Sequence, residues 1–263
     1  QHRARQKYLS AKVQVAYGSL EEALATLAEA RDAARPSRDL VWDIAILEGQ
    51  VGLRLGQWAE AEAALNAVVA EAGRAGDVYR QALALNNLGM GRLVRGRFDE
   101  AVTWFERVLD MAAVEPTSVY GVALNNAGIC YSRLGQFDRA VEVQRRAVEF
   151  HERGSRVAYQ QAIGELGTTY LLQGDFSQGL DHLRRALAIA GEANSKNDAA
   201  LWARNLAAAY HYAGRWDEAE RFNNEAKRLT PEGDDRRVWN TLHEAHIAAG
   251  RRQSATAVGL FND

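Results

Sequence analysis

Two stretches of this sequence decide its fold, and they are copies of one pattern. They read LNNLGMGRLVRGRFDEAVTWFERVL, from Leu85 to Leu109, and LNNAGICYSRLGQFDRAVEVQRRAV, from Leu124 to Val148. Both begin with Leu-Asn-Asn, and both have a glycine and then Phe-Asp near the middle. Self-similarity at a fixed spacing is the sequence signature of a repeat protein. We therefore expect the chain to be built from copies of one structural element.

The pattern continues in both directions from these stretches, around a column of glycines. Successive glycines of the column are 36 to 40 residues apart, which predicts about seven repeats. A helix often ends on a residue in the left-handed conformation, which glycine adopts without a Cβ clash. Each glycine therefore predicts a turn between the two helices of one repeat. The glycines of the column are Gly18, Gly56, Gly96, Gly135, Gly174, Gly214 and Gly250.

Further columns around each glycine predict how the two helices of a repeat pack. A small residue lies seven positions before the glycine, as at Gly89, and another lies five positions after it, as at Ala101. We expect these two columns to face each other and to bring the helices close together. A large apolar residue two positions after the glycine, as at Phe98, is expected to anchor the second helix in the core. The seventh repeat, a cap or an incomplete copy, departs from the expected small and apolar columns at His243, Arg252 and Gly259.

On these residues the chain resembles the tetratricopeptide repeat family over essentially its whole length, most strongly in the second to sixth repeats. The period near 39 residues and the Leu-Asn-Asn start are similar to the kinesin-light-chain style of this repeat, which is longer than the standard 34-residue form. The resemblance implies an all-α fold, a right-handed superhelical solenoid of about seven helical hairpins in a single array over residues 1–263. The expected repeats are 4–38, 42–80, 82–117, 121–157, 160–197, 200–233 and 236–263.

Composition excludes several other classes of protein. The 32 lysine and arginine residues nearly balance the 34 acidic ones, so the net charge of -2 provides no overall field to attract nucleic acid or anionic lipid. No stretch approaches the roughly 20 apolar residues that span a bilayer, and the start has no apolar signal-peptide core. The single cysteine, Cys130, fits a reducing compartment and is expected to be buried and structural. We expect a cytoplasmic protein, and the scarcity of lysine among the basic residues points to a bacterial source.

The first helices of such repeats line a concave groove, and repeat proteins use this surface for binding. Helical spacing places asparagines at one recurring position of this face, with apolar and charged side chains beside them. Asparagine inside a helix is less favourable than alanine by roughly half a kcal/mol, so its recurrence needs a reason outside the helix itself. The predicted peptide-binding residues are Asn86, Asn87, Met90, Asn125, Asn126, Ile129, Arg133, Glu165, Arg204, Asn205 and Tyr212.

These side chains have two interpretations each. The amides of Asn87, Asn126 and Asn205 bind the main chain of a peptide, as the resemblance implies, or they form hydrogen bonds between neighbouring repeats. Likewise, Met90 and Ile129 contact a ligand or pack against the preceding repeat.

Other residues that could carry chemistry are better explained by structural roles. The arginine pairs Arg145–Arg146 and Arg184–Arg185 are expected on the solvated outer face, with a docking or nucleic-acid patch as the alternative. His243, Glu244 and His246 do not have the spacing of a zincin metal site. No lysine follows any glycine of the column as a phosphate-binding loop requires. We therefore expect no enzymatic activity, no cofactor and no metal.

The predicted function is a protein-protein interaction module that binds a peptide or helix of a partner, in trans or from the same polypeptide. No nucleic-acid or membrane partner is expected. The alternative is a regulatory sensor arm of a multidomain bacterial protein, of the CHAT protease, STAND ATPase or transcription-activator type, and both chain ends look cut from something longer. A receptor for a small peptide pheromone is a third class, but it usually has an amino-terminal output bundle that this chain lacks. The partner and the oligomeric state stay open.

Overall fold

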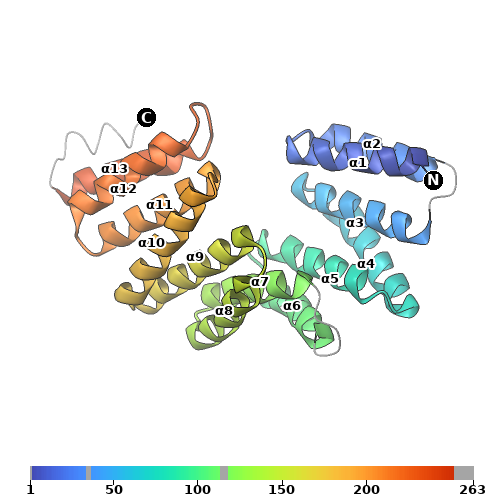
Figure 1. Ribbon diagram of the computed structural model, residues 1–263, viewed down its shortest axis with the longest axis horizontal. Coiled ribbons are helices and arrows are strands. Elements are labelled where there is room, and N and C mark those ends of the chain that lie inside the picture. The colour runs from blue at the N-terminus through green and yellow to red at the C-terminus, as the bar shows by residue number, and fades with distance from the viewer. Residues whose placement is uncertain (1, 34–36, 113–117, 252–263) are drawn as a thin grey trace. The chain divides into compact units, whose positions relative to one another are not determined.

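The structure is a computed structural model that describes residues 2–33, 37–112 and 118–251. These described residues form thirteen helices and no strand, as the repeat pattern predicts (Figure 1). The segment expected to form the second helix of the seventh repeat, with Arg252 and Gly259, lies outside the described residues. In chain order the helices are α1 (His2–Ala16), α2 (Leu20–Asp32), α3 (Arg38–Arg54), α4 (Trp58–Ala75), α5 (Val78–Leu93), α6 (Phe98–Ala112), α7 (Ser118–Arg133), α8 (Phe137–Glu152), α9 (Arg156–Gln173), α10 (Phe176–Glu192), α11 (Lys196–Tyr212), α12 (Trp216–Leu229) and α13 (Arg237–Gly250).

The helices belong to two compact units, an N-terminal unit of Gln1–Leu134 and a C-terminal unit of Gly135–Asp263. In the N-terminal unit α1 packs on α2, α3 on α4 and α5 on α6, so each pair forms a hairpin. In the C-terminal unit α9 packs on α10 and α11 on α12. First helices also contact one another: α1 with α3, α3 with α5 and α5 with α7 in one unit, and α9 with α11 and α11 with α13 in the other. Each unit therefore has one side lined by first helices, which we call its first-helix face.

The turns between paired helices confirm the prediction from the glycine column in six of the seven repeats. Gly18, Gly56, Gly96, Gly135, Gly174 and Gly214 all have a positive φ, from 70° to 94°. Gly250 is the exception, because it is the last residue of α13 and not a left-handed turn. A Cβ atom at Gly250 would lie 2.4 Å from the ring of Trp216, so this glycine permits a close approach between helices.

Most first helices begin a few residues before the expected repeats, whereas α13 begins one residue after the expected start of the seventh repeat. The third helix starts at Arg38 and the fifth at Val78, whereas the repeats were expected to start at 42 and 82. Side-chain caps explain both starts: Ser37 Oγ accepts a hydrogen bond from the Leu40 amide at 3.4 Å, and Asp77 Oδ1 accepts one from the Arg80 amide at 2.9 Å. The apolar periodicity misses this first turn because most of its residues are polar or exposed.

Inside a hairpin, the small residue before the turn faces a large side chain, contrary to the expected pairing of two small columns. A Cβ atom at Gly89 would lie 2.6 Å from the ring of Phe105, and one at Gly49 would lie 2.6 Å from Leu65. Gly167 follows the expectation in part, because its Cβ would lie 3.0 Å from the Gly179 carbonyl oxygen and 2.9 Å from the Cβ of His182. The glycines thus make room for core side chains nine positions after the turn.

The large apolar residue two positions after the turn is less buried than expected. Trp58 and Phe98 are half-buried, and Phe176 is 39% exposed. The fully buried position of the second helix is instead occupied by residues such as Leu65 and Phe105, both with 0% exposure. The column two residues after the glycine therefore packs at the edge of the core, as Leu20 and Trp216 do, and the most deeply buried position of the second helix lies two turns further on.

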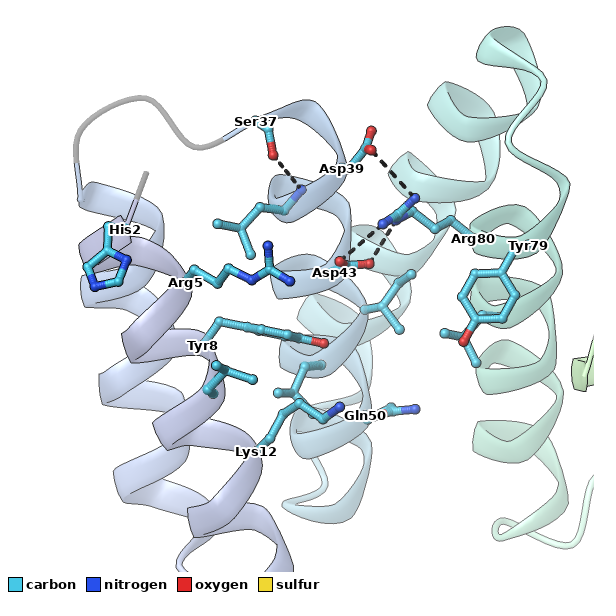
Figure 2. Close-up of a pocket in the computed structure, with 15 residues that line it drawn as sticks. His2, Arg5, Tyr8, Lys12, Ser37, Asp39, Asp43, Gln50, Tyr79 and Arg80 are labelled. Atoms are coloured by element: carbon cyan, nitrogen blue, oxygen red, sulfur yellow. Dashed lines mark hydrogen bonds and ion pairs between the residues drawn. The ribbon is translucent and has the colours of Figure 1, made fainter. Parts of the chain in front are cut away.

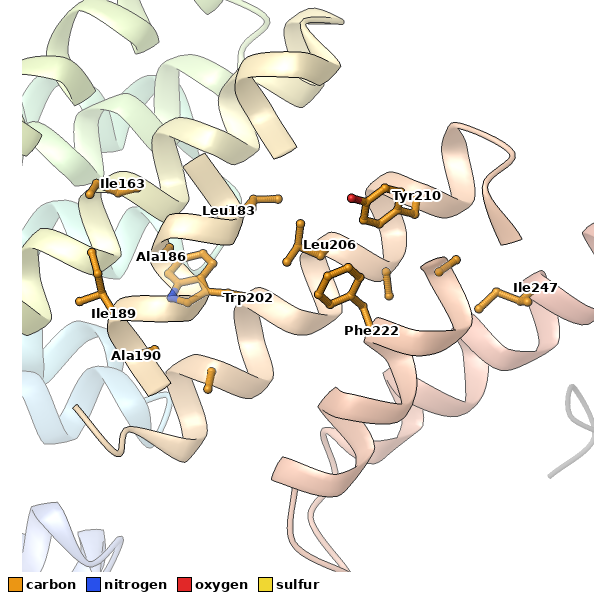
Figure 3. Packing of buried hydrophobic residues seen from close by; sticks show 13 residues of the cluster. Ile163, Leu183, Ala186, Ile189, Ala190, Trp202, Leu206, Tyr210, Phe222 and Ile247 are labelled. Carbon is orange, nitrogen blue, oxygen red and sulfur yellow. The ribbon is translucent and has the colours of Figure 1, made fainter. Parts of the chain in front are cut away.

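The core of the C-terminal unit includes Trp202, Leu183, Leu206 and Phe222 (Figure 3). Gly164 leaves the space for the indole, since a Cβ atom there would lie 2.5 Å from it. The indole nitrogen of Trp202 donates a hydrogen bond to a buried glutamine oxygen on α9 at 2.5 Å. A buried indole normally finds such an acceptor.

Tyrosines at one position of the first helices bond to the preceding hairpin. Tyr170 accepts hydrogen bonds from Arg145 at 2.6 and 3.1 Å, and Tyr210 accepts one from Arg184. Tyr131 donates to Glu106 at 2.5 Å in the same way. All four residues of the arginine pairs are exposed, as expected for a solvated face, and the first arginine of each pair also joins one hairpin to the next.

Candidate functional site

The first-helix face of the N-terminal unit contains a hollow of about 860 Å³ between α1, α3 and α5 (Figure 2). One wall is α1, which contributes Arg5, Tyr8 and Lys12. These residues lie on one face of the helix because they are spaced by three and four positions. The opposite wall is formed by α3 and α5, which contribute Asp43 and Arg80 among others.

A guanidinium surrounded by carboxylates organises the wall formed by α3 and α5. Arg80 donates to Asp43 at 2.7 Å and to Asp77 at 2.7 Å, and it lies 3.9 Å from Asp39. The hydrogen bond to Asp43 is the main cause that raises the pKa of Arg80. Burial acts to raise the pKa of Asp77, but the backbone and side-chain hydrogen bonds from Arg80 outweigh burial and lower it. Asp39 and Asp43 line the hollow and share Arg80 as their partner, so this wall keeps a negative surplus.

The wall formed by α1 has basic side chains without such partners. Neither Arg5 nor Lys12 forms an ion pair within the described part of the chain, and the Lys12 ammonium lies 5.8 Å from the ring centre of Tyr8. Burial, and then the charge of Asp43, raises the pKa of Tyr8, so its hydroxyl stays protonated. Figure 2 shows Arg5 and Tyr8 extending from α1 toward the side on which Asp43 and Arg80 lie. The hollow is therefore positive on one wall and negative on the other.

A second hollow of about 850 Å³ adjoins the first on the same unit. Its walls are mainly apolar and come from the ends of α1, α3 and α5 and the starts of α2 and α4. Gln50 lines both hollows, and its amide donates to Asn87 Oδ1 at 3.2 Å. The residues of its apolar lining are Val15, Leu20, Leu53, Leu55, Trp58, Met90 and Val94.

Two of the predicted peptide-binding residues, Asn87 and Met90, line this second hollow. Met90 is half-buried, and Asn87 is 6% exposed. Asn87 Oδ1 is bonded to Gln50, but Asn87 Nδ2 is buried without a hydrogen-bond partner among the described residues. Buried amide donors are normally paired, so an orphaned one calls for an explanation.

The other predicted residues of the N-terminal unit lie on α5 and α7. Asn126 donates to Asn86 Oδ1 at 3.2 Å, and both amides are buried. Asn125 and Ile129 are half-buried, and Arg133 is exposed. The described hydrogen bonds of the asparagines thus run between neighbouring first helices, which is the second of the two interpretations given above. None of these five residues lines either hollow.

The predicted residues of the C-terminal unit lie on α9 and α11. Asn205 donates to Thr168 at 3.4 Å, and Arg204 donates to the Arg236 carbonyl at 3.4 Å. Burial lowers the pKa of Arg204. Glu165 is half-buried, whereas Tyr212 is 79% exposed. The face therefore offers an exposed aromatic side chain next to polar groups that already have partners.

Three histidines gather near these residues, on α11 and α13. The rings of His211 and His246 are stacked with centres 5.4 Å apart. Burial lowers the pKa of His243 to about 4, and the charges of His211, His246 and Arg204 act in the same direction. In the portion of the chain that is described, no group of three or more potential ligands could hold a metal ion.

Two further predictions concern Cys130 and membrane-spanning helices. Cys130 is fully buried, as expected, and burial raises the pKa of its thiol to about 12. No helix among the described residues has the length and apolar character needed to cross a membrane.

Sequence reasoning missed the residues of the first hollow. Arg5, Tyr8 and Lys12 lie in the first repeat, where the resemblance is weakest, and they do not recur in other repeats. The one available signal was their spacing on a single face of α1, which places two basic residues and an aromatic side by side.

Family models of known proteins match most of the repeats. Residues 80–153 and 160–232 match the family model described as tetratricopeptide repeat, and residues 7–48 match one described as anaphase-promoting complex subunit 5. A search of the curated proteins finds no match.

Among solved structures, the chain is similar to a Signal Transduction ATPase with Numerous Domains (STAND) protein with a tetratricopeptide repeat sensor from Pyrococcus horikoshii. The TM-score is 0.75 at 15% identity, over 97% of this chain and 41% of that one. A tetratricopeptide repeat protein from Parabacteroides merdae gives a TM-score of 0.67 at 14% identity, over 100% and 92% of the two chains. Kinesin light chain TPR-like repeats from Podosopora anserina give a TM-score of 0.59 at 20% identity, over 70% of this chain and 92% of that one. These likenesses confirm the predicted fold class.

Proposed function

Because the chain belongs to the tetratricopeptide repeat family, whose repeats form protein-interaction scaffolds, we propose that it binds a peptide segment of a partner protein. The proposed site is the first-helix face of the N-terminal unit. We also propose the predicted residues of the C-terminal unit, on α9 and α11, as a second binding surface.

The observation that carries this proposal is the pair of adjoining hollows, about 860 and 850 Å³, which share Gln50. Each volume lies in the range of roughly 300–1,000 Å³ that is usual for ligand sites in proteins. The orphaned Nδ2 of Asn87 supports it, because a carbonyl oxygen of a bound peptide would satisfy this donor. A folded partner domain would need a flatter surface than a hollow between three helices.

A random dodecapeptide library displayed on phage tests the proposal, with the full chain as bait and calorimetry on the selected peptides. Met90→Trp fills the second hollow, so we expect it to weaken a selected peptide about tenfold or more at an unchanged melting temperature. The matched control is Val122→Trp, which places the same side chain on α7 at a position 42% exposed and outside both hollows. Failure to select any peptide, or equal weakening by both variants, contradicts the proposal.

A second candidate function is that of a regulatory arm that restrains or releases an effector domain. The likeness to the STAND protein favours this function, because a tetratricopeptide repeat array is the sensor of that protein. This chain covers 41% of the length of that protein. Sequencing the gene beyond the region that encodes these residues tests it. An adjoining ATPase, protease or DNA-binding domain supports the regulatory arm, and a reading frame that encodes only the repeats refutes it.

A further inference from the structure

We propose that the peptide bound on this face carries two acidic side chains about three residues apart, which pair with Arg5 and Lys12, and a large apolar side chain that enters the second hollow. The inference rests on the proposed function and names the class of its ligand.

The basic side chains of α1 are the free charges of the first hollow. Arg80 on the opposite wall is bonded to Asp43 and Asp77, whereas Arg5 and Lys12 form no ion pair in the parts of the chain that are described. A cation that lines a cavity without a partner gains most from a ligand of opposite charge. The chain as a whole is nearly neutral, so its overall electrostatic field would not select an acidic ligand. The local charges of Arg5 and Lys12 would do so.

The opposite wall determines how such a ligand is oriented. Asp39, Asp43 and Asp77 surround the single guanidinium of Arg80, and the side chain of Asp39 is 59% exposed. This surplus of negative charge repels an acidic side chain from α3 and α5. Carboxylates of the ligand are therefore held on the α1 side, because like charges are unfavourable at short range.

Helix geometry sets the spacing of the two acidic residues. Arg5 and Lys12 are seven positions apart on one face of α1, which corresponds to roughly 10 Å along the helix at 1.5 Å per residue. A peptide in the polyproline II conformation rises about 3.1 Å per residue with three residues per turn, so side chains three residues apart lie on one face and span roughly the same distance. A peptide that runs along α1 can thus pair both charges at once.

The apolar requirement comes from the second hollow, which continues from the first at Gln50. Val94 is 59% exposed within it, and Trp58 is half-buried beside it. Exposed apolar side chains in a concave site gain stability when a ligand covers them. The peptide therefore has an acidic part for the first hollow and a large apolar side chain for the second.

Selection from the same dodecapeptide library tests this inference separately from the proposed function. Peptides selected on the unaltered chain should contain two acidic residues three apart and a large apolar residue to one side of them. The variant with Arg5→Glu and Lys12→Glu should weaken these peptides about tenfold or more and should itself select basic peptides. The loss should shrink as salt is raised, because salt screens exposed charges.

Matched variants separate the local charges from the net charge. Arg3→Glu with Arg74→Glu changes the net charge by the same amount at exposed positions outside both hollows, and it should leave the affinity within about twofold. Val94→Asn should weaken the same peptides several-fold, whereas Val122→Asn should not. Selected peptides that lack acidic residues, or that bind both double variants equally, overturn the inference and leave the peptide-binding function intact. Failure to select any peptide overturns the function itself.

Discussion

The first-helix faces of the two units are built from the same sequence columns but carry different chemistry. In the N-terminal unit, α1, α3 and α5 enclose two hollows with one basic, one acidic and one apolar part. In the C-terminal unit, α11 and α13 bring together three histidines and the half-buried Arg204. A shared repeat therefore determines the backbone of a face, while the side chains at its variable positions determine what the face can bind.

The largest expected effect tests whether the two cores are equivalent. Trp202→Ala in the C-terminal unit and Phe105→Ala in the N-terminal unit each empty a position that is at most 1% exposed. Each should lower the free energy of unfolding by about 3–5 kcal/mol, from lost burial and the cavity left behind. Urea denaturation followed by circular dichroism measures this loss. A cost below about 1 kcal/mol for either variant would show that its core position is misassigned.

A smaller effect is expected from glycines that make room for core side chains. Gly89→Ala places a Cβ atom 2.6 Å from the Phe105 ring and should cost about 1–3 kcal/mol by overpacking. Gly191→Ala in α10 is the matched control, because its added Cβ meets nothing within 4 Å. The control should stabilise the protein by about 0.5–1 kcal/mol, since alanine is the better helix former. Thermal unfolding of both variants should therefore shift in opposite directions, and a shift in the same direction contradicts the packing.

The asparagine bonds between first helices should differ in strength between the units. Asn126→Ala leaves the buried Asn86 oxygen without a donor and should cost about 1–2 kcal/mol. Asn205→Ala removes a longer, half-buried bond to Thr168 and should cost about 0.5 kcal/mol or less. Denaturant midpoints of the two variants give the comparison. Equal and negligible costs would instead favour the view that these amides serve a bound ligand.

A modest pH dependence is expected from the C-terminal unit. The pKa of His243 is about 4 in the folded protein, below its unfolded value of about 6.5, so the folded state disfavours the charged form. Stability should be constant above about pH 6.5 and fall as the pH decreases toward 4, by about 1 kcal/mol at pH 5 after allowance for partial exposure. Melting curves at pH 7.5 and 5 measure the difference. His243→Leu should reduce it, and His2→Leu, at an exposed position of α1, should not.

If the pH dependence survives in His243→Leu, the histidine cluster is not its source. In that outcome His243 would not give the two first-helix faces a different response to protons. The His211 and His246 rings, stacked 5.4 Å apart, would be the next pair to change, because burial and the neighbouring His246 also lower the pKa of His211.

The sequence by itself determined the helices, the turns and much of the core. Glycine at a spacing of 36 to 40 residues is enough to predict a left-handed turn, since no other residue adopts that conformation as easily, and six of seven such turns are present. These features are local: they depend on residues within a few turns of helix. The same reasoning placed Asn87 and Met90 on the face that is now the candidate site.

Only the tertiary structure decided which side chains meet across repeats. The Gln50 amide bonds Asn87, and Arg145 bonds Tyr170, between residues 37 and 25 positions apart. A periodic pattern predicts that such positions are neighbours on one face. A hydrogen bond also needs a donor and an acceptor about 3 Å apart, and the repeat period does not specify that distance. The same limit hid the first hollow, because Arg5 and Lys12 acquire a role only when α3 and α5 supply the opposite wall.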